Sequence, residues 1–221
     1  MVIITIRGQL GSGATDIGKR VAERLQIDYV DREVIAGVAK QLDYPEKKIE
    51  SQEMPPTSVF KRIGEALGRS YPASISSGGI SAPMPMYLPA SEIPLDDDSY
   101  LKGLETTIQE LAKENPIVIS GRGSQFILKD NPDTFHVLIT APLAIRINRV
   151  MGSMNLNKNA ARQEIKKYDS SRHEFIKRYF KADLEDPNNY DMVINTEHLS
   201  YEDAASIIID SLALQGRVAG D

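Results

Sequence analysis

The fold is decided by residues 2–15, VIITIRGQLGSGAT. The first five of these residues form a short β-branched apolar run, which is typical of a strand buried on both faces. A glycine-rich turn follows, and beyond it Ile17, Val21 and Leu25 recur at helical spacing over residues 14–25. The stretch therefore predicts a strand, a glycine turn and a helix in immediate succession.

The glycine turn is comparable with the phosphate-binding pattern G-x-x-x-x-G-K-[ST]. Glycines allow successive backbone N–H groups to point inward, and the helix N-terminus adds partial positive charge. We therefore expect phosphate binding by the turn, with the hydroxyl of Thr15 on a magnesium ion, although a tight strand-to-helix turn without a ligand is the alternative. The expected phosphate-binding residues are Gly8, Gly11, Ser12, Gly13, Ala14 and Thr15.

The turn lacks the lysine of this pattern, because Ala14 occupies its position. Lys19 lies five residues further along the predicted helix, roughly 140° around it from Ala14, so it does not replace the missing ammonium. Arg7, directly before the turn, is a better candidate for restoring the charge.

The remainder of the chain alternates between strand and helix patterns. Such alternation predicts an α/β fold with a parallel sheet flanked by helices, and ligands in such folds bind at the carboxyl ends of the strands. The glycine turn, Asp31, Gly121-Arg122 and Asn195-Thr196 all follow predicted strands. The further strands are expected at 27–30, 116–120, 135–140 and 190–195. The further helices are expected at 32–43, 142–151 and 158–181. Two more helices are expected, one that is capped by Asp98 or Ser99 and runs to about 113, and one that is capped by Ser200.

Length and composition indicate one domain. The 221 residues carry a net charge of −5 and no cysteine, which excludes a disulfide framework and cysteine nucleophiles and disfavours non-specific nucleic-acid binding. The apolar runs are too short for a signal peptide or a membrane span, so we expect a cytoplasmic protein without a membrane partner. The segment 45–100 interrupts the alternation and becomes rich in Ser, Pro, Gly and Met after residue 70, which is typical of a functional or disordered insertion.

Positive charge is concentrated in residues 146–181, which contain ten Lys or Arg and three acidic residues. The rest of the chain therefore carries a net charge of −12. Arginine can bind phosphate oxygens in a bidentate manner, so this segment is a candidate phosphate-binding surface. A solvated basic helix face, with pairs such as Asp169 and His173, is the alternative.

In several motifs the chain resembles the cytidylate kinase-like family of P-loop proteins. The motifs are Ile4-Thr5-Ile6 through Gly11-Ser12-Gly13 and Asp16-Ile17-Gly18, Tyr29-Val30-Asp31, Val118-Ile119-Ser120-Gly121-Arg122-Gly123, the A-x-x-x-x-R-x-x-R pattern of Ala141 to Arg149, the D-x-x-R pattern of Asp169 to Arg172, and Tyr190-Asp191 to Asn195-Thr196. The resemblance is weakest over 45–100.

The resemblance implies a single P-loop kinase-like domain over 1–221, in which 45–100 binds the acceptor and 152–182 is a helical lid. It implies transfer of the γ-phosphoryl group of ATP, with Mg²⁺, to a small phosphorylated acceptor, of which CMP is the family's default. The implied catalytic residues are Arg122, Arg146, Arg149 and Arg172. Asp31, Arg122 and Asp169 are the implied substrate-binding residues, although Asp31 could instead be a metal-side ligand or a helix cap.

The chain departs from the family pattern at four positions. Ala14 replaces the loop lysine, Ser120 and Gly123 replace the two aspartates that flank the arginine, and Tyr168 stands at a lid arginine position. These departures keep two alternatives open: a nucleotide-binding regulatory or interaction module with a degenerate loop, and a kinase for another phosphorylated metabolite. A homodimer is also left open.

Overall fold

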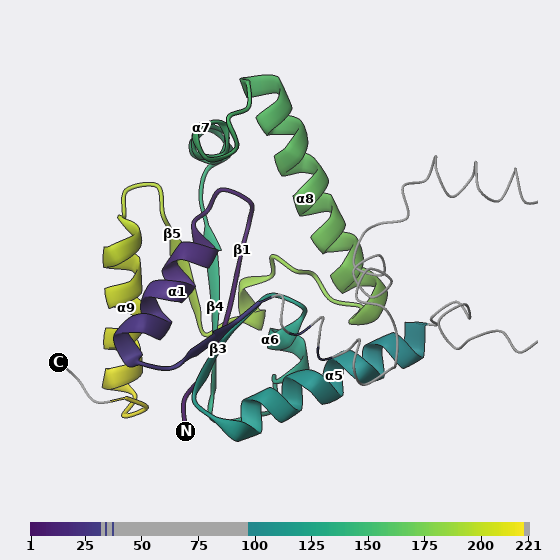
Figure 1. The fold of residues 1–221 in the computed structure, drawn as a ribbon, viewed down its shortest axis with the longest axis vertical. Helices are drawn as coiled ribbons and strands as arrows, with labels where there is room; N and C mark the ends of the chain where they lie inside the picture. Colours follow the sequence, from purple (N-terminus) through teal and green to yellow (C-terminus); the bar gives the residue numbers. More distant parts are fainter. Residues whose placement is uncertain (32–33, 35–36, 38–96, 219–221) are drawn as a thin grey trace, which may run out of the picture.

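A computed structural model describes residues 1–31, 34, 37 and 97–218. These residues form a five-stranded parallel sheet with helices on both faces (Figure 1). The strands are β1 (Ile3–Gly8), β2 (Asp28–Val30), β3 (Ile117–Ser120), β4 (Thr134–Thr140) and β5 (Met192–Asn195). The helices are α1 (Ala14–Leu25), α5 (Asp97–Glu114), α6 (Ser124–Ile127), α7 (Leu143–Met154), α8 (Lys158–Tyr179), the 3₁₀ turn η2 (Pro187–Asn189) and α9 (Tyr201–Leu214).

The sheet has the order β2-β3-β1-β4-β5, which places β1 at its centre. Ile4 pairs with Val118 of β3 on one side and with Phe135 of β4 on the other. A central strand is buried on both faces, and this explains why β1 reads as an unbroken apolar run. The predicted parallel α/β architecture is confirmed.

Alternate residues of β1 belong to two separate cores. Ile4 and Ile6 pack with α1 and α9, whereas Ile3 packs on the opposite face with residues of α5 and α8. Figure 1 shows the same division, with α1 and α9 on one side of the sheet and α5, α6 and α8 on the other. A third, smaller core joins α7 to α8 through Ile147, Val150, Ala161 and Ile165.

Several helix boundaries test the sequence predictions. Ser200 caps α9, because its hydroxyl oxygen accepts a hydrogen bond from Asp203 N at 3.0 Å, as predicted. The cap at Asp98 or Ser99 is wrong, since α5 already includes Asp97. The short α6 and η2 were not predicted, because a four-residue helix and a 3₁₀ turn show too little periodicity to detect.

The predicted lid and insertion are only partly within the described residues. The predicted lid covers 152–182. Its first residues belong to the end of α7, and most of its other residues form α8. Of the predicted insertion, 97–100 begin α5, and 45–96 lie outside the described residues, as does most of the helix predicted over 32–43. None of the helices within 1–31 and 97–218 is long and apolar enough to cross a membrane.

Candidate active site

The glycine turn leaves β1 at its carboxyl end and enters α1 in a conformation that requires glycine. Gly11 and Gly13 have φ angles of 82° and 94°, in the left-handed region that side chains disfavour. A Cβ on Gly8 would lie 2.9 Å from the carbonyl oxygen of Ile139 and would also clash with Ser12 and Ala14. These three glycines therefore allow the chain to fold tightly back over the end of the strand.

The turn leaves backbone N–H groups available at the start of α1. Gly13 is the N-cap and offers no side-chain cap, and the first helical hydrogen bond runs from Ile17 N to Gly13 O at 2.9 Å. The N–H groups of Ala14, Thr15 and Asp16 precede that bond and have no intrahelical acceptor. Unsatisfied donors at a helix N-terminus form a site suited to an anion.

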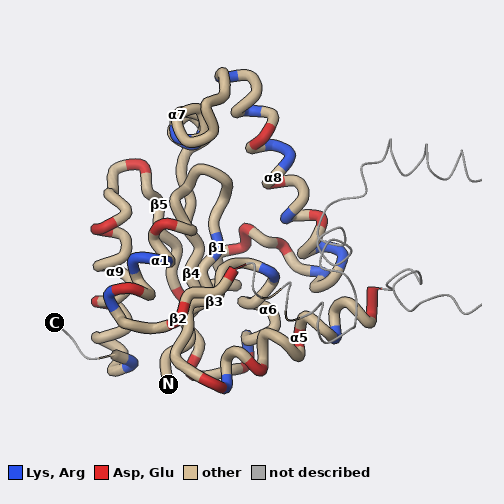
Figure 2. The backbone as a smooth tube through the Cα atoms, in the orientation of Figure 1, with Lys and Arg blue, Asp and Glu red and all other residues tan. Residues whose placement is uncertain are grey.

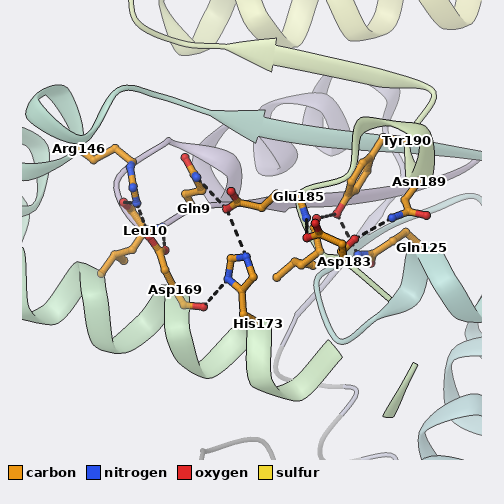
Figure 3. Close-up of polar contacts among 11 residues, drawn as sticks. Gln9, Leu10, Gln125, Arg146, Asp169, His173, Asp183, Glu185, Asn189 and Tyr190 are labelled. Carbon is orange, nitrogen blue, oxygen red and sulfur yellow. Dashed lines mark hydrogen bonds and ion pairs between the residues drawn. The ribbon is translucent and has the colours of Figure 1, made fainter. Parts of the chain in front are cut away.

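The outer side of the turn is bound by α7 and α8. Asp169 of α8 accepts a hydrogen bond from Leu10 N at 3.3 Å and pairs with Arg146 Nη1 at 2.7 Å. Arg146 also donates to Leu10 O at 3.3 Å, which closes a ring of three residues (Figure 3). Gln9 donates to Glu185 at 2.9 Å, so two successive turn residues are bound by side chains from α8 and from the segment that follows it.

Arg149 of α7 joins the turn to the segment after β5. Its Nη2 donates to Thr196 O at 2.7 Å, and its Nη1 lies 2.8 Å from Thr196 Oγ1 and 3.3 Å from Gly11 O. Thr196 in turn donates to Ser12 O at 2.8 Å, and the Arg149 guanidinium stacks on the ring of Tyr201. Both Arg146 and Arg149 thus hold backbone carbonyls of the turn in this structure.

Arg122 and Asp31 meet at the ends of two adjacent strands. Arg122 Nη2 lies 3.7 Å from Asp31 Oδ1, and the Arg122 side chain is 9% exposed. Arg122 has a positive φ of 60° between Gly121 and Gly123, so the local backbone lifts its side chain out of the strand direction. Both residues follow strands, as predicted, and the adjacency of β2 and β3 in the sheet brings them together.

Oxygen groups gather around the hydroxyl of Tyr29, near the start of α1. Burial raises the pKa of Tyr29 and the Asp31 carboxylate raises it further, whereas the nearby hydroxyls of Ser120 and Thr15 partly oppose this change without forming a hydrogen bond of ordinary geometry to the Tyr29 hydroxyl. Within the described residues no three His, Cys, Asp or Glu side chains form a metal-binding group. Hydroxyl and carboxylate oxygens together with phosphate and water suit Mg²⁺, which keeps several of its waters in proteins, so the side-chain oxygens of Thr15, Ser120 and Asp31 are of a chemical type that fits this ion.

The other predicted residues have mixed positions. Arg172 stacks on the Tyr168 ring, with its guanidinium carbon 5.2 Å from the ring centroid. His173 contacts the backbone oxygen of Asp169, at 3.0 Å from its Nδ1, while the carboxylate of Asp169 faces the turn. Tyr179 and Phe180 pack against the aromatic rings of Tyr100, Phe126 and Phe175.

Three residues around the turn were not predicted from the sequence as site residues: Glu185, Thr196 and Tyr201. Thr196 was predicted only to follow a strand, and Glu185 and Tyr201 belong to none of the sequence motifs described above. Figure 2 shows Lys and Arg residues along α8, on the side of the molecule where α7 and α8 rise above the sheet. The glycine turn is therefore bound by residues that lie far from it in the sequence.

Comparisons with known proteins agree with this architecture. Residues 3–198 match a family model described as the cytidylate kinase-like family. Cytidylate kinases of the archaea Desulfurococcus amylolyticus and Staphylothermus marinus are 30% and 29% identical to the chain, over 94% of its length and over 91% and 94% of theirs.

Solved structures share the fold at lower identity. An uncharacterized protein from Eubacterium ventriosum superposes with a TM-score of 0.66 at 20% identity, covering 96% of this chain and 98% of that one. A sugar kinase from Janibacter sp. superposes with a TM-score of 0.52 at 13% identity, covering 100% and 99%. At these identities the likeness concerns the fold alone.

Proposed function

Because this chain belongs to the cytidylate kinase-like family, we propose that it is a nucleotide kinase that transfers the γ-phosphoryl group of ATP to a small phosphorylated acceptor, with CMP as the first acceptor to test. The observation that carries the proposal is the glycine turn with free N–H groups at the start of α1, with Arg146 and Arg149 of α7 bound to the turn and Arg122 beside Asp31 at the neighbouring strand ends. Phosphoryl transfer requires mainly positioning and stabilisation of charge, and this arrangement offers both.

The proposed roles follow from the positions of the residues. The N–H groups of the turn bind the nucleotide phosphates, and Thr15, Ser120 and Asp31 hold Mg²⁺, which neutralises phosphate charge when bound. Arg122 and Arg172 bind the acceptor phosphate and the transferred group, because a planar guanidinium fits two phosphate oxygens. No protein base is required in this scheme.

Arg146 and Arg149 hold the glycine turn in place in this proposal. Their bonds to Leu10, Gly11 and Thr196 hold the turn in one conformation before any ligand arrives. A preorganised site loses less entropy on binding than one that must be ordered. These two arginines thus contribute positive field and rigidity together, and α8 excludes water from the phosphates.

A nucleotide-binding module without turnover is the second candidate. It is favoured by Ala14, which removes the ammonium that reaches the transferred phosphate, and by the carbonyl contacts that occupy Arg149. Such a module would bind ATP through the same turn and transfer nothing. A kinase for another phosphorylated metabolite is the third candidate, and it differs from the first only in the acceptor.

One screen separates these candidates. The purified protein is incubated with ATP and Mg²⁺ and, in parallel, each nucleoside monophosphate and a panel of phosphorylated metabolites, while ATP binding is measured by calorimetry. Transfer to CMP supports the proposal, and transfer to a different acceptor identifies the third candidate. ATP binding without transfer to any acceptor supports the module, and absence of ATP binding at millimolar concentration contradicts all three.

A further inference from the structure

Arg7 is a buried arginine whose two Nη groups have no hydrogen-bond partner of ordinary geometry. The residue is 7% exposed, and neither Nη1 nor Nη2 makes a hydrogen bond of ordinary geometry. Burial of this kind is costly unless the charge is paired, and burial lowers the pKa of Arg7. A bound anion would compensate this buried positive charge, so the Arg7 guanidinium is a candidate ligand-binding group.

The side chain points to the face of the sheet opposite α1. Residues of β1 alternate, and Arg7 shares the face of Ile3, which packs with α5 and α8, while Ile4 and Ile6 pack with α1 and α9. The titratable groups around Arg7 come from that same side: Tyr168 and Asp169 of α8, and Glu185 and Tyr190 beyond it. Arg7 thus lies beneath the glycine turn on the α8 side.

The two acidic neighbours are bound to other groups. Each carboxylate oxygen of Asp169 accepts a hydrogen bond, Oδ1 from Leu10 N and Oδ2 from Arg146 Nη1. Glu185 Oε1 accepts from Gln9 at 2.9 Å and lies 4.0 Å from His173 Nε2 (Figure 3). These carboxylates attract the guanidinium through space but leave its Nη donors unused.

A second unsatisfied polar group lies close by. Burial raises the pKa of Tyr190, and the charge of the neighbouring Arg7 and a polar interaction between the two side chains partly oppose this, although neither Arg7 Nη atom makes a hydrogen bond of ordinary geometry. The Tyr190 hydroxyl accepts from Gln125 Nε2 at 3.2 Å and donates to Leu184 O at 2.6 Å, whereas Gln125 Oε1 is buried without a partner. Tyr190 thus links Arg7 to a second side chain, Gln125, that has a buried polar atom without a partner.

We propose that Arg7 binds a phosphate group of the reacting ligands from the α8 side of the sheet and so supplies the positive charge that Ala14 lacks. Two free Nη donors form a planar fork that matches two phosphate oxygens. The glycine turn begins at the next residue, so Arg7 lies at the carboxyl end of β1, where the turn leaves the strand. The inference rests on the proposed function only in assuming a phosphate-bearing ligand, which is either the nucleotide or the acceptor.

The test compares three variants by calorimetry, without turnover. Arg7→Met removes the charge and keeps an apolar chain, whereas Arg7→Lys keeps the charge. Arg20→Met is the control, because Arg20 of α1 is an exposed arginine that pairs with Glu202 of α9. Each protein is titrated with ATP plus Mg²⁺ and, separately, with CMP. We expect Arg7→Met to bind at least one of these ligands about 10- to 100-fold more weakly, with partial recovery in Arg7→Lys and no change in Arg20→Met.

The ligand that loses affinity identifies the source of the phosphate: ATP for the nucleotide, CMP for the acceptor. Melting temperature is the second readout, and Arg7→Met should melt at or above the parent because an unpaired buried charge is gone. Unchanged binding of both ligands, a parent that binds neither, or a variant that melts well below the parent or fails to fold would each overturn the proposal. Failure of phosphoryl transfer in the parent would instead contradict the kinase function and leave the binding result standing.

Discussion

Arg146 Nη1 lies 2.7 Å from Asp169 Oδ2, and both side chains also bind the backbone of Leu10, one at its carbonyl oxygen and one at its N–H. The Arg146 side chain is 8% exposed and that of Asp169 is 19% exposed, so this ion pair is largely shielded from water. Three segments that are distant in the sequence, the glycine turn, α7 and α8, are therefore joined at one point. The conformation of the turn and the position of α8 are coupled through this pair.

We expect Asp169→Asn to destabilise the protein by about 3 kcal/mol, because removing one partner leaves the buried Arg146 charge uncompensated. Chemical denaturation measures the change. Glu174→Gln is the matched control, since Glu174 is an exposed carboxylate on the same helix, and it should remain within about 0.5 kcal/mol of the parent. Equal stability of Asp169→Asn and Glu174→Gln would show that the pair does not brace the turn.

Arg149→Ala should lower stability by about 2 kcal/mol and should also weaken ATP binding, because the side chain satisfies Thr196 O and contacts the carbonyl oxygen of Gly11. Arg149→Lys should recover only part of either loss, since one ammonium cannot reproduce a planar fork on two separated acceptors. Differential scanning calorimetry and ATP titration of both variants test this. Full recovery by lysine would indicate that charge alone matters at this position.

Gly13→Ala should abolish ATP binding, because the new Cβ would clash with the ring of Tyr201 and the residue has a φ of 94°. Gly216→Ala is the control for backbone strain alone, since Gly216 has a φ of 69° and no atom within 4 Å of the added Cβ. It should cost about 1 kcal/mol of stability and leave ATP affinity intact. Normal ATP binding by Gly13→Ala would contradict the role of the turn.

Arg122→Ala and Arg172→Ala separate a kinase from a binding module. In a kinase, each loss should lower kcat about 10²–10³-fold with a smaller effect on KM for ATP, since these groups act on charge that develops during transfer. Lys166→Ala, an exposed cation on α8, should transfer phosphate at the parental rate. Variants of Arg122 and Arg172 that both keep the parental kcat would argue against the assigned roles.

The stability of the protein should fall as the pH decreases below about 6.5, the ordinary pKa of histidine. Burial lowers the pKa of His136, which is 9% exposed and contacts Thr5 Oγ1 through its Nδ1 at 2.7 Å. The unfolded chain therefore takes up a proton at a pH where the folded state does not, so acidification favours unfolding down to the folded-state pKa. Unfolding free energies of the parent and of His136→Gln from pH 5 to 8 test this, and an equally steep profile in the variant would exclude His136 as the cause.

The sequence by itself determined the fold and the position of the site along the chain. The apolar run of β1, the glycine turn and the helical spacing of Ile17, Val21 and Leu25 are local patterns, and α1 has the predicted bounds. Alternation of strands and helices then required a parallel sheet, because parallel neighbours need a crossover connection. Asp31 and Arg122 could be expected to meet, since the ends of parallel strands share one edge.

Only the tertiary structure decided what each arginine contacts. Arg146 and Arg149 are three residues apart on one helix, yet one binds Asp169 and Leu10 and the other Thr196, because side chains with a 100° rotation per residue face different neighbours. No local pattern indicates that Arg7 is left without a hydrogen-bond partner for its Nη atoms, since that depends on Asp169 and Glu185 being bound to other groups. Secondary structure follows from neighbours in the sequence, whereas the state of a buried charge depends on every segment packed around it.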